Sequence, residues 1–91
     1  MRVVNNHDRH RYEAWVSDQL AGFATYNERP GVIVMLHTET EDAFEGQGIG
    51  SQLASAVLDD LRSRGLQVKP VCPFFAGFIA RHPEYADLVA G

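Results

Sequence analysis

The sequence predicts an α/β fold with a mixed, mostly antiparallel sheet, a parallel strand–helix–strand crossover and two main helices. Three observations lead to this prediction. Several stretches in the first 40 residues have the alternation or the β-rich composition of strands. A glycine-rich loop then opens a segment with helical periodicity. A short strand and a helix that begins with proline follow. At 91 residues, the chain fits one domain, 1–91, with one modest core.

The first third of the chain predicts antiparallel strands. Val3 and Val4 open a short strand, and the segment Arg11–Val16 alternates roughly between two faces. Turn-forming residues separate the later strands, including the pair Pro30–Gly31. The expected elements are a strand at 11–16, a turn at 17–19, a hairpin partner at 20–26 and a second turn at 27–31.

The rest of the chain predicts the crossover and the last helix. Val32–His37 is a β-rich run that we expect to form a central strand buried on both faces, with strand character reaching Thr40. Apolar residues recur at helical spacing from Ile49 to Leu61, and a glycine follows. The remaining expected elements are a helix end at Gly65, a parallel strand at 67–71, and a helix at 73–79 that Pro83 stops.

Composition narrows the class of function. The formal net charge of −4 and the pI of about 5.4 argue against a broad nucleic-acid-binding face, which must be basic. No apolar run approaches the roughly 20 residues of a membrane span, and the polar segment 1–11 does not resemble a signal peptide. The single cysteine allows no internal disulfide. We therefore expect a cytoplasmic protein with neither a nucleic-acid nor a membrane partner.

The glycine loop Glu45–Ser51 is the clearest candidate binding motif. Glycines let the backbone approach an anion closely, and a helix N-terminus offers unpaired N–H groups with a partial positive charge. A diphosphate fits such a site without a lysine. A flexible strand-to-helix turn explains the loop equally well. The loop matches neither a Walker A motif nor the dinucleotide fingerprint, because the Lys-Ser/Thr ending is missing and the glycines are too closely spaced.

The loop resembles the diphosphate loop of the N-acetyltransferase (GNAT) superfamily, Arg/Gln-x-x-Gly-x-Gly/Ala. Gly48 and Gly50 match this form, and Glu45 departs from it at the first position. The chain is more specifically similar to a small group of short, stand-alone acetyltransferase-like proteins. The similarity covers nearly the whole chain through the segments Leu36–Glu39, Glu45–Ser51, Cys72–Phe74 and Arg81–Tyr85.

The resemblance implies a GNAT-like fold and an acyltransferase that uses acetyl-CoA as co-substrate and an amine as acceptor. It implies that the CoA diphosphate rests on the backbone of the loop and that the pantetheine arm lies along the central strand. The implied cofactor-binding residues are Leu36, Thr38, Gly46, Gln47, Gly48, Ile49, Gly50 and Ser51. Arg81 is a further candidate, as a partner for a CoA phosphate.

Cys72 is the leading candidate catalytic residue. It ends a predicted strand directly before Pro73, which begins a helix, and a helix N-terminus favours the thiolate. A lone cysteine is more often a small buried apolar residue. The resemblance favours catalysis, because these relatives are thought to use the cysteine of Cys-Pro-Phe. The tyrosine that commonly protonates CoA in the superfamily is replaced by Ala80 when Ala76 is aligned with the motif alanine.

His37 is the candidate general base, since an imidazole titrates near neutral pH and this one lies at the end of the central strand. A hydrogen-bonded structural histidine is an equally good explanation. His82, in Arg-His-Pro, is expected to cap a helix. No spacing of histidine and cysteine predicts a metal site.

Three functions are compatible with these observations. The first is acetyl transfer to an amine with Cys72 as the catalytic thiol. The second is a non-catalytic acyl-CoA-binding or regulatory module, because 91 residues leave little chain for an acceptor pocket. The third is a thiol redox protein, which the absence of a second cysteine disfavours.

Overall fold

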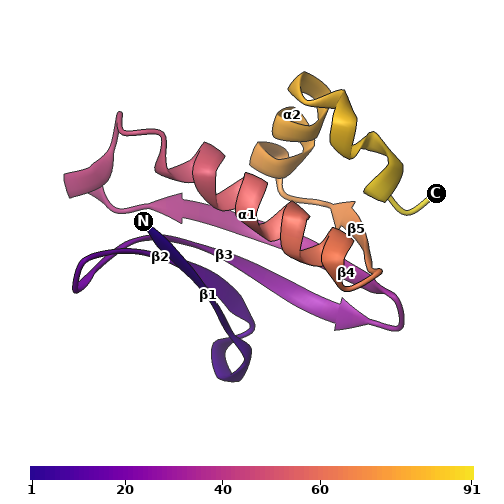
Figure 1. Cartoon of the computed structure of the whole chain (residues 1–91), viewed down its shortest axis with the longest axis horizontal. Coiled ribbons are helices and arrows are strands. Elements are labelled where there is room, and N and C mark those ends of the chain that lie inside the picture. Colours follow the sequence, from indigo (N-terminus) through magenta and orange to yellow (C-terminus); the bar gives the residue numbers. More distant parts are fainter.

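The computed structural model describes residues 1–91 and contains a five-stranded sheet (Figure 1). The strands follow one another across the sheet in chain order, β1-β2-β3-β4-β5. Strands β1 to β4 pair with one another in antiparallel fashion, whereas β5 pairs with β4 in parallel. The strands are β1 Arg2–Asn6, β2 Arg11–Val16, β3 Gln19–Arg29, β4 Val32–Thr40 and β5 Gln67–Pro70.

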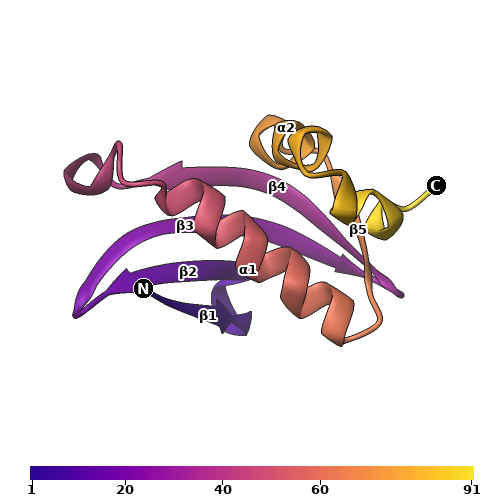
Figure 2. The same cartoon turned by 45° about the horizontal axis from the view of Figure 1, so that its top comes forward.

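Two α-helices follow the antiparallel strands. Helix α1, Ile49–Ser63, connects β4 to β5, and α2, Pro73–Arg81, follows β5. Three short 3-10 segments, which the sequence did not predict, cover His7–Arg9, Asp42–Phe44 and Pro83–Leu88. Figure 2 shows both α-helices lying against the sheet. No helix combines the length and the hydrophobicity that crossing a membrane requires.

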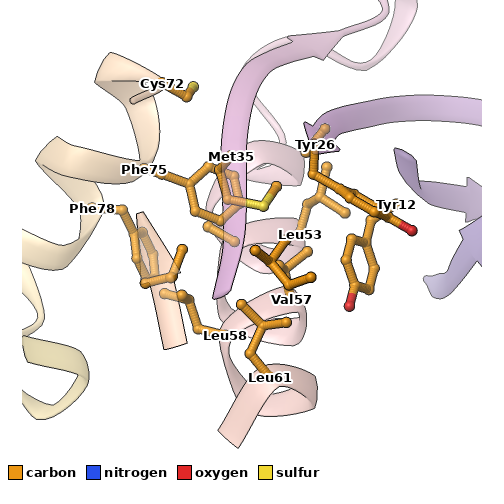
Figure 3. Close-up of a cluster of buried hydrophobic side chains, with 14 of the residues drawn as sticks. Tyr12, Tyr26, Met35, Leu53, Val57, Leu58, Leu61, Cys72, Phe75 and Phe78 are labelled. Carbon is orange, nitrogen blue, oxygen red and sulfur yellow. The ribbon is translucent and has the colours of Figure 1, made fainter. Parts of the chain in front are cut away.

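One apolar core lies between the sheet and the two helices. Met35 of β4 is fully buried in it, as are Leu53 and Leu58 of α1 and Phe75 of α2. Figure 3 shows these side chains together. The core takes every second residue of the strands, which is the pattern of a sheet covered on one face.

The predicted order of elements and the parallel crossover are confirmed, and one expectation about β4 is wrong. The strand is not buried on both faces: Ile33 and Met35 are buried, whereas Val32 and Val34, which alternate with them, are partly exposed. Both helices cover the same face, so the β-branched residues of the other face stay near solvent. Strand β3 is also longer than the expected 20–26, because the hairpin closes in a tight turn at Pro30–Gly31.

The uncovered face of the sheet carries a buried carboxylate, Glu13, which is only 5% exposed. It accepts hydrogen bonds from Asn6 Nδ2 at 3.1 Å, Arg11 Nε at 2.7 Å and Trp15 Nε1 at 3.2 Å. Burial raises the pKa of this carboxyl, but the three donors together outweigh burial and hold the pKa below its ordinary value. Arg11 also lies over the ring of Phe23, 4.6 Å from its centroid. These contacts connect the side chains of the uncovered face, called the open face below.

Candidate active site

The glycine loop forms the N-terminus of α1, as the sequence predicted. Gly46 and Gly48 have positive φ angles of 80° and 73°, in the left-handed region that favours glycine. Gly48 is the N-cap of the helix and has no side chain to satisfy the first amides. The N–H groups of Ile49, Gly50 and Ser51 therefore have no backbone acceptor in the chain. Such a set of free amides is suited to bind an anion.

A hollow of about 340 Å³ lies at these amides. Its wall includes Glu45, so the carboxylate that departs from the family pattern is beside the candidate anion site. Gln47 is exposed and does not line the hollow; its carbonyl accepts a hydrogen bond from Gln52 Nε2 at 3.4 Å. The lining residues are Thr40, Phe44, Glu45, Gly46, Gly48, Ile49, Gly50, Ser51 and Phe74.

Gly50 differs from the other two glycines of the loop. Its backbone is helical, and a Cβ atom at this position would lie 2.8 Å from Cζ of Phe74. Phe74 belongs to the first turn of α2, directly after Cys72–Pro73. The phenylalanine of Cys-Pro-Phe thus packs on the last glycine of the loop. The absence of a side chain at Gly50 makes room for Phe74 and brings the beginnings of the two helices together.

Cys72 lies where β4 and β5 separate. The ladder between these strands ends at the pair Met35 and Pro70, and the Cys72 N–H then donates to the Met35 carbonyl at 2.8 Å. Beyond this point, β4 continues to Thr40 without a partner on its β5 side. The exposed apolar side chains of Leu36 and Val71 flank the separation. The unpaired edge of β4 is therefore available to an extended ligand.

Cys72 is 3% exposed, and its thiol has one side-chain hydrogen-bonding partner. Its Sγ atom is 3.3 Å from Oγ1 of Thr38, and either atom can be the donor. Cys72 is the N-cap of α2, although its side chain makes no capping hydrogen bond. Figure 3 shows it at the rim of the core cluster, apart from the other labelled side chains. The predicted place at a helix start is confirmed; the catalytic role stays a prediction.

His37 lies on the other face of the sheet from Cys72. Thr38 is opposite Ala24, which is fully buried under the helices, whereas His37 is opposite Thr25, which points to the open face. The imidazole is exposed and its Nε2 is 3.7 Å from Glu39 Oε1. The structure therefore does not bring His37 and Cys72 into contact.

A β-bulge at Leu36 causes this arrangement. Tyr26 pairs with Met35 and Thr25 pairs with His37, so Leu36 is an extra residue in β4. A regular strand would place His37 on the same face as Met35. The extra residue reverses the alternation, so Thr38 faces the helices and His37 faces the open side.

The remaining predicted residues lie farther away. Arg81 ends α2, seven residues after Phe74, which is about 10 Å along the helix axis and away from the loop. His82 has the capping role expected of it: its Nδ1 lies 2.9 Å from the Phe78 carbonyl, and its ring stacks on Phe78 with centroids 4.0 Å apart. Tyr85 does not replace the missing tyrosine, because its hydroxyl donates to Asp59 of α1.

Sequence reasoning missed several side chains of the candidate site, among them Glu39 and Phe74. Glu39 is the neighbour of His37, and strand alternation alone signals that these two share a face. Phe74 is the partner of Gly50, and no local pattern reveals that contact.

A larger hollow of about 490 Å³ lies on the outer side of α1 and shares only Ser51 with the loop hollow. The smaller one is the better candidate because it contains the free amides.

Three comparisons with known proteins bear on the family. The family model described as GCN5-related N-acetyl-transferase matches residues 11–88. A curated protein from cattle, Protein NATD1, is 33% identical over 52 residues, which cover 57% of this chain. The match spans 46% of that protein, so the chain covers about half the length of this relative.

Two solved structures share the fold. A GCN5-like protein of Staphylococcus aureus, proposed to be an N-acetyltransferase, has a TM-score of 0.74 at 22% identity, over 99% of this chain and 88% of that chain. A second Staphylococcus aureus protein, proposed to be an acetyltransferase, has a TM-score of 0.58 at 16% identity, over 80% of this chain and 62% of that chain. The family-model match extends from β2 to the last 3-10 segment, so the chain belongs to the GCN5-related N-acetyltransferase family.

Proposed function

We propose that this protein transfers an acetyl group from acetyl-CoA to an amine and that Cys72 is its catalytic thiol. The observation that carries the proposal is the convergence of two features. The free amides of Ile49–Ser51 and the thiol of Cys72 belong to two helix N-termini, and the contact between Gly50 and Phe74 joins these termini. In this proposal the loop binds the diphosphate and the separation of β4 and β5 receives the pantetheine arm.

The amides supply the affinity that a cationic side chain commonly supplies for a phosphate. The chain has no Lys or Arg between Thr38 and Leu61, and Glu45 borders the hollow. A carboxylate repels the diphosphate unless it turns outward, and Glu45 is exposed and free to turn. Binding therefore depends on backbone N–H groups and on the partial charge of α1.

Two chemical routes use the thiol. In the two-step route, the Cys72 thiolate attacks the thioester carbonyl, the carbon–sulfur bond to CoA breaks, and CoA leaves as a thiolate. The amine then attacks the acetyl-cysteine and releases the Cys72 thiolate, and the proton that the nitrogen loses passes through water to the CoA thiolate. In the direct route, the amine attacks the thioester, the Cys72 thiol donates its proton to the departing CoA thiolate, and the Cys72 thiolate that results takes up the proton that the nitrogen loses.

His37 has a separate place in the proposal. It is exposed on the open face, beside Glu39, where an acceptor can approach the separation of the strands from the side away from the helices. A neutral imidazole there removes a proton from the incoming ammonium group and leaves an amine able to attack. Glu39 stabilises the imidazolium that results.

A non-catalytic acyl-CoA-binding module is the second candidate. The burial of Cys72 favours it, because a cysteine that is 3% exposed is typical of a core residue. One experiment separates the two functions: wild-type protein and Cys72→Ser are incubated with acetyl-CoA and a mixture of amines, and acetylated amines are measured by mass spectrometry. The enzyme hypothesis predicts products with wild type and a large loss with Cys72→Ser. Binding of acetyl-CoA without any product supports the binding module and contradicts the enzyme.

A further inference from the structure

The side chain of Thr38 has no role in the functions described so far, in which only its backbone is a candidate for binding the pantetheine arm. Its hydroxyl is nevertheless the side chain that hydrogen-bonds to the Cys72 sulfur, at 3.3 Å. The two residues are 34 positions apart in the sequence and come from β4 and from the start of α2. Their contact crosses the gap where β4 and β5 part.

Two features of the backbone create this contact, and the burial of Cys72 makes it matter. The bulge at Leu36 reverses the alternation of β4 and turns Thr38 toward the helices. The hydrogen bond from the Cys72 N–H to the Met35 carbonyl fixes the start of α2 against β4. Burial of Cys72 then leaves its sulfur with little access to water, so a protein donor matters more than at an exposed thiol.

We propose that Thr38 is a positioning residue whose hydroxyl donates a hydrogen bond to the thiolate of Cys72 and holds it at the separation of β4 and β5. The role of Thr38 in catalysis rests on the proposed function, but the hydrogen bond itself can be tested without acetyl-CoA. A hydroxyl that donates to a thiolate stabilises the charged form relative to the thiol. The same hydroxyl accepts from the thiol when the sulfur is protonated, so the contact survives both states.

The test compares Thr38→Val, which keeps the shape and loses the hydroxyl, with Thr38→Ser, which keeps the hydroxyl. The pH midpoint of the Cys72 alkylation rate is measured by intact-mass spectrometry; the chain has only one cysteine, so the reaction is unambiguous. We expect the midpoint to rise by about one pH unit in Thr38→Val and to stay near that of wild type in Thr38→Ser. Thr25→Val, on the open face, is the matched control and leaves the midpoint unchanged.

A second measurement does not depend on access of the reagent. The S–H stretching band of Cys72 in the Raman spectrum reports the hydrogen bonding of the thiol. We expect the band to shift in Thr38→Val and to keep its wild-type position in Thr38→Ser. Equal midpoints and equal bands in wild type and Thr38→Val would overturn the proposal.

Turnover then separates this inference from the proposed function. If both hold and catalysis follows the two-step route, Thr38→Val loses turnover near neutral pH and regains it at higher pH, while KM for acetyl-CoA stays nearly constant. If the proposed function fails and this inference holds, Thr38→Val moves the midpoint although Cys72→Ser is fully active. An unchanged midpoint with an inactive Cys72→Ser variant contradicts only the role of Thr38.

Discussion

The ring of Phe74 packs against the backbone of Gly50, so that a Cβ at residue 50 would lie 2.8 Å from its Cζ atom. This contact joins the helix that follows the glycine loop to the helix that follows Cys72. Phe74 is 36% exposed, so it also forms part of the wall of the loop hollow. Phe74 therefore packs the glycine loop against the segment that carries Cys72.

This contact predicts that the effect of Gly50→Ala on the free energy of unfolding changes sign when the Phe74 ring is removed. Glycine to alanine in a helix ordinarily stabilises by about 1 kcal/mol. In Gly50→Ala the new methyl must displace Phe74, so we expect a loss of about 1–2 kcal/mol instead. In a Phe74→Ala background, Gly50→Ala should raise the melting temperature. A stabilising Gly50→Ala in the wild-type background would show that Phe74 moves away at no cost.

The two glycines with positive φ allow a matched test of cofactor binding. Gly48 is the N-cap at the hollow, and Gly31 is in the β3–β4 turn; both have a φ near 74°, and at both a Cβ atom would meet no backbone atom. Valine should destabilise the protein by roughly 1–2 kcal/mol at either position because the conformation is left-handed. Acetyl-CoA should still raise the melting temperature of Gly31→Val and should not do so for Gly48→Val.

An undiminished shift in Gly48→Val would remove the loop from the binding site. An equal loss of the shift in both variants would contradict the predicted difference between Gly48 and Gly31, because it would reflect general instability and not a local effect at Gly48.

His37 gives a prediction for turnover. His37→Ala should lower turnover by roughly 10²–10⁴-fold with little change in affinity for acetyl-CoA, since the base acts on the acceptor amine. Glu39→Gln removes the charge beside the imidazole and should have a smaller effect in the same direction. Full activity of His37→Ala would eliminate the catalytic role, and a loss of folding would identify His37 as a structural residue.

Glu13 gives a prediction for stability against pH. The pKa of Glu13 is lowered in the folded protein. The ionised carboxylate therefore stabilises the fold at pH values above the ordinary carboxyl pKa of about 4.5, and this stabilisation is lost as the pH falls through the lower pKa of the folded state. Glu13→Gln should therefore be less stable than wild type at pH 7, and the difference should shrink toward pH 3. Urea unfolding at a series of pH values measures it, with exposed Glu28→Gln as the control. A difference independent of pH would contradict the account.

Local patterns were sufficient to predict the order of elements. Alternation identified β2, helical spacing identified α1, and Pro73 marked the start of α2. The coverage of the sheet was not predictable in this way. The β-rich composition of Val32–Val34 is equally compatible with burial on one face or two, because the choice depends on where both helices pack.

The sequence was sufficient to name candidate residues of the site, but not to predict which of them lie on the same face of the sheet or in contact. The bulge at Leu36 leaves no signature in composition, yet it decides that His37 and Cys72 occupy opposite faces. The loop pattern predicts that Gly50 lets the backbone approach an anion, whereas its neighbour is an aromatic ring 24 positions away in sequence. Contacts of this kind depend on tertiary packing, so local periodicity cannot reveal them.

The most direct test of the central claim is alkylation of Cys72 in the native protein, followed by intact-mass spectrometry with and without acetyl-CoA. If the thiol lies at the acyl end of the bound co-substrate, a small alkylating reagent should modify it in the native protein. Acetyl-CoA at about ten times its dissociation constant should slow this alkylation about tenfold. A native thiol that is inert to alkylation, together with a fully active Cys72→Ser variant, would contradict the claim and leave Cys72 a residue of the core.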